Sequence, residues 1–180
     1  MKKKIEKIGI LGGTFDPCHF GHLKISSEAK TKFKLKKVIW AITKKSPFKK
    51  LSKTKLEERI KACKNFTKKI KFIEINYYEK VIKSNKTFDL LSYLKKKINN
   101  IELYLIIGAD NLITFHKWKK WKNISQKSII VVFDRYPYKS KAVKSLAFKR
   151  IDKNRLKFLS FKNSVTSTLP KMNGCSYSSF

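Results

Sequence analysis

Two kinds of hydrophobic pattern alternate along the chain. Strand-like runs rich in apolar and β-branched residues fall at 5–11, 38–42, 70–75, 103–107, 129–133 and, more weakly, 157–161. Between the earlier runs, apolar residues recur every three or four positions, at 23–33, 56–66 and 88–98. The runs predict strands, and the recurring positions predict helices that each bury one face. Strands and helices therefore alternate over most of the chain.

This alternation indicates the fold class. The runs 103–107 and 129–133 are apolar without interruption, which is typical of parallel strands covered on both faces. Strands separated by helices require right-handed crossovers and form a parallel sheet with helices on both sides. We therefore expect an α/β fold, a doubly wound Rossmann-like parallel sheet, as a single domain over 1–180. Within it 164–180 is atypical in composition, because Ser, Thr, Gly and Cys are common there, whereas the preceding chain is rich in lysine.

Local signals mark where two helices begin. Thr54-Lys55-Leu56-Glu57 has the form of a capping box, which predicts Thr54 as the N-cap of the helix at 56–66. Thr87 stands directly before the periodic stretch at 88–98 and suits the same role there.

Length and composition indicate a soluble protein. The 180 residues, 42% of them apolar, are enough for one packed core. No apolar run approaches the ~20 residues of a membrane span, and neither an apolar signal region nor a cleavage site follows the basic start at 1–4. The three cysteines, Cys18, Cys63 and Cys175, are an odd, scattered set, which favours a reducing compartment. We expect a cytoplasmic protein without a membrane partner.

The net charge of +32 points to anionic partners. Of the 44 basic residues only Arg59, Arg135, Arg150 and Arg155 are arginine, although arginine suits the bidentate reading of bases and phosphates. The lysines are spread along the whole chain. We therefore favour a solvated lysine coat over a nucleic-acid surface, and anionic substrates would be attracted under either interpretation.

The most informative segment follows the first predicted strand: residues 12–22 read GGTFDPCHFGH. The two glycines allow a sharp turn and close approach of a ligand, and a helix starting near Gly21 offers unpaired N–H groups to an anion. His19 and His22 can both donate hydrogen bonds to phosphate from that turn. The alternative is a tight turn with two capping histidines. A zinc site from Cys18, His19 and His22 is disfavoured because no second ligand cluster is evident.

This segment resembles the signature Gly-Gly-Thr-Phe-Asp-Pro-x-His-x-Gly-His of nucleotidyltransferases, specifically of bacterial nicotinate-nucleotide adenylyltransferases. Five further segments resemble motifs of that family: 46–49 (Ser-Pro-Phe-Lys), 87–91 (Thr-Phe-Asp-Leu-Leu), 108–111 (Gly-Ala-Asp-Asn), 115–121 (Phe-His-Lys-Trp-Lys-Lys-Trp) and 134–135 (Asp-Arg). The resemblance covers most of the chain.

The resemblance implies transfer of the adenylyl group of ATP, with Mg²⁺, to nicotinate mononucleotide in NAD biosynthesis. His19 and His22 would be catalytic, and the protein itself would hold no metal. The residues implied for ATP are Gly12, Gly13, Thr14, Phe15, His19, His22, Gly108, Asp110, Arg135, Ser167 and Thr168. Those implied for the mononucleotide are Lys49, Thr87, Asp110 and Trp118.

The end of the chain departs from the family pattern. Thr166-Ser167-Thr168-Leu169-Pro170-Lys171 stands where the family has Ser-Ser-Thr-x-Ile-Arg. The hydroxyl groups remain, but proline replaces isoleucine and lysine replaces arginine. The lysine ammonium is a point charge, whereas the arginine guanidinium can form two parallel hydrogen bonds, so we expect weaker binding of the triphosphate.

Structural roles compete with these assignments. Asp110 can cap a helix, Phe115, Trp118 and Trp121 can form one buried helical face, Lys49 is one of several lysines, and Arg135 can form a surface ion pair. Two other functions stay open: another nucleotidyltransferase, such as phosphopantetheine adenylyltransferase, and a non-catalytic basic protein that binds nucleic acid. The sequence also leaves the oligomeric state open, a homo-oligomer included.

Overall fold

The structure, a computed structural model, describes residues 5–45, 52, 54–134 and 136–160. Its elements, in chain order, are β1 (Glu6–Gly13), α1 (Phe20–Phe33), β2 (Lys37–Ile42), α2 (Leu56–Thr67), β3 (Ile73–Asn76), α3 (Glu79–Ile82), α4 (Thr87–Lys97), β4 (Ile101–Gly108), α5 (Ala109–Thr114), the 3₁₀-helix η1 (Phe115–Lys117), α6 (Trp121–Lys127), β5 (Ser128–Phe133), α7 (Lys139–Val143), α8 (Leu146–Arg150) and β6 (Leu156–Leu159). In this part of the chain, no helix has the length and apolar character needed to cross a bilayer.

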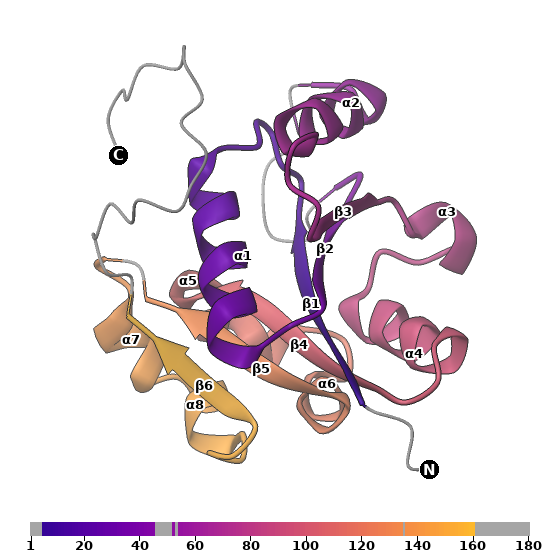
Figure 1. Ribbon diagram of the computed structural model, residues 1–180. Coiled ribbons are helices and arrows are strands. Elements are labelled where there is room, and N and C mark those ends of the chain that lie inside the picture. The colour runs from indigo at the N-terminus through magenta and orange to yellow at the C-terminus, as the bar shows by residue number, and fades with distance from the viewer. Residues whose placement is uncertain (1–4, 46–51, 53, 135, 161–180) are drawn as a thin grey trace.

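The described strands form one parallel sheet in the order β3-β2-β1-β4-β5-β6 (Figure 1). The chain winds outward from β1 to β3 and then returns to place β4 on the other side of β1. The expected doubly wound α/β fold is thereby confirmed. This order also creates a switch point between β1 and β4, and ligands of open α/β sheets bind outside the carboxyl ends of the strands at such a point.

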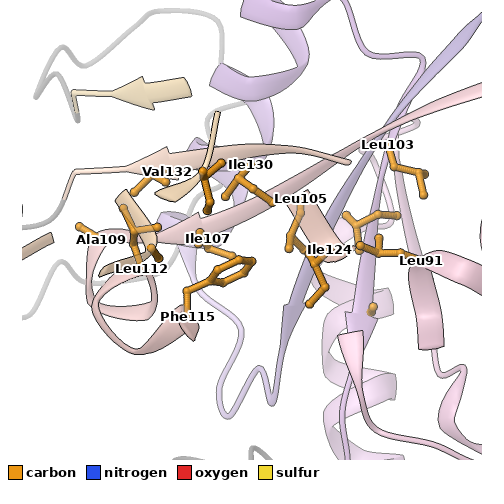
Figure 2. Close-up of a cluster of buried hydrophobic side chains, with 14 of the residues drawn as sticks. Leu91, Leu103, Leu105, Ile107, Ala109, Leu112, Phe115, Ile124, Ile130 and Val132 are labelled. Carbon is orange, nitrogen blue, oxygen red and sulfur yellow. The ribbon is translucent and has the colours of Figure 1, made fainter. Parts of the chain in front are cut away.

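Each face of the sheet carries its own hydrophobic core. On β4, Leu103, Leu105 and Ile107 belong to one cluster, whereas Tyr104 and Ile106 belong to the other, as the alternation of side chains along a strand requires. The first cluster includes side chains of α4, α5, α6, α7 and α8, and Figure 2 shows part of it. The second includes side chains of α1 and α2. Burial on both faces explains the uninterrupted apolar runs of β4 and β5.

Several element boundaries differ from the sequence predictions. The third strand, expected at 70–75, is limited to Ile73–Asn76, and the last, expected at 157–161, runs from Leu156 to Leu159. The short helices α3, α7 and α8 were not predicted, because four or five residues are too few to show a helical period.

Both N-cap predictions are wrong. Helix α2 has Lys55 as its N-cap, with no side-chain bond, because the Thr54 hydroxyl donates instead to Asp16 Oδ1 at 2.6 Å. Helix α4 has Lys86 as its N-cap, so Thr87 is its first helical residue.

Helix α1 is fastened to the sheet through Ser26. Its fully buried hydroxyl accepts from the indole Nε1–H of Trp40 on β2, at 2.8 Å, and donates to the carbonyl of His22, at 2.7 Å. Trp40 is itself fully buried. Without Ser26, the indole N–H would lack this acceptor in an apolar environment, which is costly.

We therefore expect Ser26→Ala to lower the free energy of unfolding by about 1–3 kcal/mol in urea denaturation. Ser125→Ala is the matched control, because the Ser125 hydroxyl also donates to a carbonyl within its own helix but lies at the surface. The control should change stability by less than about 0.5 kcal/mol. Equal effects of the two substitutions would show that the buried pair with Trp40 contributes nothing specific.

Candidate active site

The segment 12–22 lies at the carboxyl end of β1, on the switch-point edge of the sheet. β1 ends at Gly13 and is hydrogen-bonded to β2 and β4, and β4 ends at Gly108. Residues 14–19, which we call the first loop, lead from β1 into α1. Asp110 is the second residue of α5, two positions after the end of β4. The sequence-predicted residues of these two segments are thus brought to neighbouring strand ends.

His19 and His22 cap α1 reciprocally. His19 is the N-cap, in an extended conformation, and its Nδ1 accepts from the Gly21 backbone N–H at 3.1 Å. His22, three residues on, accepts through its own Nδ1 from the His19 backbone N–H at 3.3 Å. The two rings lie with their centroids 3.9 Å apart. The capping interpretation of the histidines is therefore correct, and the imidazoles form a capping box in place of the usual hydroxyl and carboxylate.

This capping has a chemical consequence for both rings. A nitrogen that accepts a hydrogen bond carries no proton, so the proton of a neutral imidazole lies on Nε2. Each ring can then present an Nε2–H donor at the positive end of α1. Capping and phosphate binding therefore use different nitrogens and are compatible.

Within the first loop, Phe15 turns its side chain into the second hydrophobic core. Its ring is 2% exposed, stacks on Trp40 with centroids 4.9 Å apart, and lies 4.7 Å from the ring of His22. Its φ of 50° is in the left-handed region, which is strained for an aromatic residue. A contact of Phe15 with ATP would have to come from its backbone, since its ring is occupied in packing.

The glycines of the site differ in what they accommodate. A Cβ at Gly12 would meet nothing within 4 Å, so packing does not require glycine there, and Gly12 leaves room for an approaching ligand. A Cβ at Gly108 would lie 2.3 Å from Asp110 Oδ1, so this glycine makes space for the carboxylate. Gly108 is the N-cap of α5 and makes no side-chain cap, so the interpretation of Asp110 as the N-cap is wrong.

Contacts between α4 and the segment of Trp118 bring together two of the residues implied for the mononucleotide. Asp89, in the first turn of α4, accepts from the Ser84 hydroxyl at 2.6 Å and from Lys119 Nζ at 3.3 Å. The Ser84 hydrogen bond and, next, Lys119 lower the pKa of the Asp89 carboxyl. Lys120 Nζ lies 4.8 Å from the ring centroid of Phe88. These contacts dock the residues after Trp118 onto the start of α4, where Thr87 lies.

Phe115, Trp118 and Trp121 do not share one helix, contrary to the single-face interpretation. Phe115 starts η1 and is fully buried, whereas Trp121 starts α6. Trp118 lies between them, half-buried, with its ring centroid 5.0 Å from that of Phe115. Its indole N–H is buried and has no hydrogen-bond partner in the described part of the chain.

Comparison with known proteins identifies the family. The family model described as cytidylyltransferase-like matches residues 10–178. A protein of Pelagibacter ubique (strain HTCC1062), named as a probable nicotinate-nucleotide adenylyltransferase, is 52% identical over 96% of this chain and 96% of its own length. The chain belongs to this family. Within it, the chain is a member of the nicotinate-nucleotide adenylyltransferases.

More distant members agree with this placement. A protein of Bradyrhizobium sp. (strain ORS 278) with the same name is 34% identical over 83% of this chain and 78% of its own length. Two structures of the Plasmodium falciparum nicotinic acid mononucleotide adenylyltransferase, complexed with APC and with NaAD, each superpose with a TM-score of 0.68. They cover 93% of this chain and 76% and 77% of their own, at 18% and 17% identity, and so share the fold.

Four residues that the family pattern implies lie outside the described residues: Lys49, Arg135, Ser167 and Thr168. Their assignments stay predictions. Among the residues that the structure does describe, no group of His, Cys, Asp and Glu is arranged to hold a metal ion.

Sequence reasoning missed Arg59 of α2, whose side chain is 3% exposed. Its guanidinium donates to four backbone carbonyls: Thr14 in the first loop, Thr43 and Lys44 after β2, and Thr54 before α2. The one signal available was that arginine is rare in this lysine-rich chain.

Next to this arginine, on the β2 and β3 side, lies a cavity of about 730 Å³. Its lining includes Lys44, Tyr77 and Glu79. Glu79, at the start of α3, accepts from the Thr43 hydroxyl and the Lys44 backbone N–H. The carboxyl edge of the sheet is thus polar and open beside the first loop.

Two of the cysteines that are scattered in sequence meet at this place. Cys18 of the first loop and the buried Cys63 of α2 are free thiols. The interaction of the two thiols lowers the pKa of Cys18 and raises that of Cys63, whose burial acts in the same direction. The third cysteine, Cys175, lies outside the described residues.

The cap geometry makes a prediction for Gly21. A Cβ at this position would lie 2.8 Å from Cε1 and 2.9 Å from Nδ1 of His19, so alanine would displace that ring. Alanine should otherwise favour the helix by about 0.5–1 kcal/mol. We expect Gly21→Ala to keep or raise stability in urea and to weaken ATP binding about tenfold in calorimetry, as the loss of one charge-assisted hydrogen bond would. Ser27→Ala in the same helix is the control, and equal ATP affinities of both variants would contradict the prediction.

Proposed function

We propose that this protein transfers the adenylyl group of ATP to nicotinate mononucleotide, releasing pyrophosphate and forming nicotinate adenine dinucleotide for NAD biosynthesis. The observation that carries the proposal is the pair of imidazoles capping α1 at the switch point of the sheet. Their Nε2–H donors and the start of α1 form an anion site. The family to which the chain belongs supports the choice of substrates.

The reaction requires no nucleophile from the protein. A phosphate oxygen of the mononucleotide attacks the α-phosphorus of ATP, a new P–O bond forms, and the bond to the pyrophosphate oxygen breaks. The protein therefore acts by aligning two anions and by stabilising the charge that develops during transfer. His19 and His22 would donate from Nε2 to phosphate oxygens of ATP. Gly12, with no side chain, lets the triphosphate approach the backbone.

The mononucleotide would bind where the segment of Trp118 meets the start of α4. The face of Trp118 would stack on the nicotinate ring, and Thr87, at the start of α4, would contact the nucleotide through its hydroxyl. Asp110, at the end of β4, would accept from ribose hydroxyls. Lys49, Arg135, Ser167 and Thr168 are proposed to complete the two sites as the family pattern implies.

Mg²⁺ would enter with ATP, as part of the substrate. The first loop offers imidazole N–H donors where a resident magnesium site would need oxygen ligands. The ion would neutralise phosphate charge and act as a Lewis acid at the phosphorus. The chain's own residues would then hold the remaining phosphate oxygens.

The substrate assignment is tested by measuring pyrophosphate release with ATP, Mg²⁺ and a panel of acceptors. We expect the highest kcat/KM with nicotinate mononucleotide, and lower values with nicotinamide mononucleotide and phosphopantetheine. A higher value with phosphopantetheine would replace the proposal with the alternative transferase. No release with any acceptor, together with tight, salt-sensitive RNA binding, would favour the non-catalytic function.

The role of His19 can be separated from its capping role with asparagine. Asparagine is as good an N-cap as any residue but has no counterpart of Nε2. We expect His19→Asn to keep the melting temperature within a few degrees and to lower kcat by ~10²–10³, the usual effect of removing a donor to developing charge. Ser145→Asn is the matched control, because Ser145 caps the remote helix α8 through Phe148 N. Near-normal turnover of a folded His19→Asn protein would refute the catalytic assignment.

Chelation tests the proposed place of Mg²⁺. EDTA should reduce pyrophosphate release to background, and added Mg²⁺ should restore it. The melting temperature of the ATP-free protein should change by less than about 1 °C, because only a ligand bound to the folded state stabilises it. A clear fall in melting temperature would show a resident metal and contradict the proposal.

A further inference from the structure

The first loop is held from the side by α2, and we propose that Arg59 of α2 is a positioning residue that sets this loop for nucleotide transfer. The inference rests on the proposed function, because the loop carries His19 and leads to His22. Arg59 acts through the backbone of the loop, whereas the histidines act on the substrate.

The four hydrogen bonds of Arg59 converge from three separate segments. Nη1 donates to the carbonyls of Thr14 and, at 3.0 Å, of Thr43. Nη2 donates to the Lys44 carbonyl and Nε to the Thr54 carbonyl, each at 3.2 Å. Every acceptor lies in a loop at the carboxyl edge of the sheet, and none lies within a strand or helix. The side chain therefore fixes the edge where the site lies.

The environment of Arg59 makes its guanidinium group hard to replace with another cation. The side chain is 3% exposed, and among the described residues no carboxylate lies within 4.0 Å of it. Among the described residues its guanidinium is bound by carbonyl oxygens and not by an ion pair, so each bond matters both to the cation and to the carbonyl. Lysine offers three donors at a single point, whereas the planar guanidinium offers five in fixed directions. Lysine therefore cannot reach all four acceptors together.

A second contact joins the same loop to the segment before α2. Asp16 accepts from the Thr54 hydroxyl at 2.6 Å and from the Thr54 backbone N–H at 3.2 Å. The loop is thus held at Thr14 and at Asp16, which flank Phe15, the residue with a φ of 50°. A strained residue persists only where its surroundings over-determine it.

The test compares Arg59→Lys and Thr54→Val with the wild type. We expect Arg59→Lys to lower kcat about 30- to 100-fold, the cost of an ångström-scale misplacement, with less than threefold change in KM for nicotinate mononucleotide. Thr54→Val removes only the hydroxyl donor to Asp16 and should lower kcat about three- to tenfold. In the double variant the effects should be less than multiplicative, because both residues act on one loop. Arg155→Lys, at an exposed arginine, is the control and should stay within about twofold.

Hydrogen exchange supplies a readout that does not depend on turnover. The amides of 14–22 should exchange faster in both variants than in the wild type, while those of β4 should not change. A uniform rise over the whole chain, or a kcat loss with no local change at 14–22, would overturn the positioning role. If Arg59→Lys fails to fold, Thr54→Val and Asp16→Asn carry the same test. An inactive wild type would refute the proposed function, and the exchange pattern alone would then decide the role of Arg59.

Discussion

Two histidine ring nitrogens cap the amino end of α1, and the candidate site depends on this cap. His19 and His22 each accept a backbone N–H through Nδ1. An imidazolium has no acceptor nitrogen, so both bonds require rings that are unprotonated at Nδ1. The fold thereby favours the neutral tautomer that carries its N–H on Nε2. Helix formation and the chemistry of the site are two results of the same pair of hydrogen bonds.

This cap depends on two sets of contacts. In the second hydrophobic core, the ring of Phe15 stacks on Trp40, and Ser26 links that indole to the His22 carbonyl. On the α2 side, Arg59 binds the Thr14 carbonyl of the loop and Thr54 binds its Asp16 carboxylate. Loops carry function best when a rigid scaffold fixes them. Here the scaffold is the second hydrophobic core, and the ties to α2 extend it to the loop's outer side.

The sequence predicts the fold well because burial leaves a pattern at every strand. The runs at 103–107 and 129–133 needed only apolarity to be recognised. The two glycines and two histidines of 12–22 marked the strand end that carries the chemistry, although Gly12 and Gly13 lie in β1 and not in the expected turn. The side chain–backbone ties left no such pattern. Every residue has a carbonyl, so nothing in the sequence shows that Arg59 collects four of them. Thr54 was misassigned because its hydroxyl is recruited by a carboxylate 38 positions away, at Asp16.

The contact between Gly108 and Asp110 limits how this site can change over evolution. Any side chain at position 108 would occupy the space of the Asp110 carboxylate, 2.3 Å from its Cβ. A lineage that gained a larger residue at 108 would therefore have to move its acidic group or lose it. A side chain at position 108 therefore requires a shift of the Asp110 carboxylate, so the glycine determines where that acid can lie beside the end of β4.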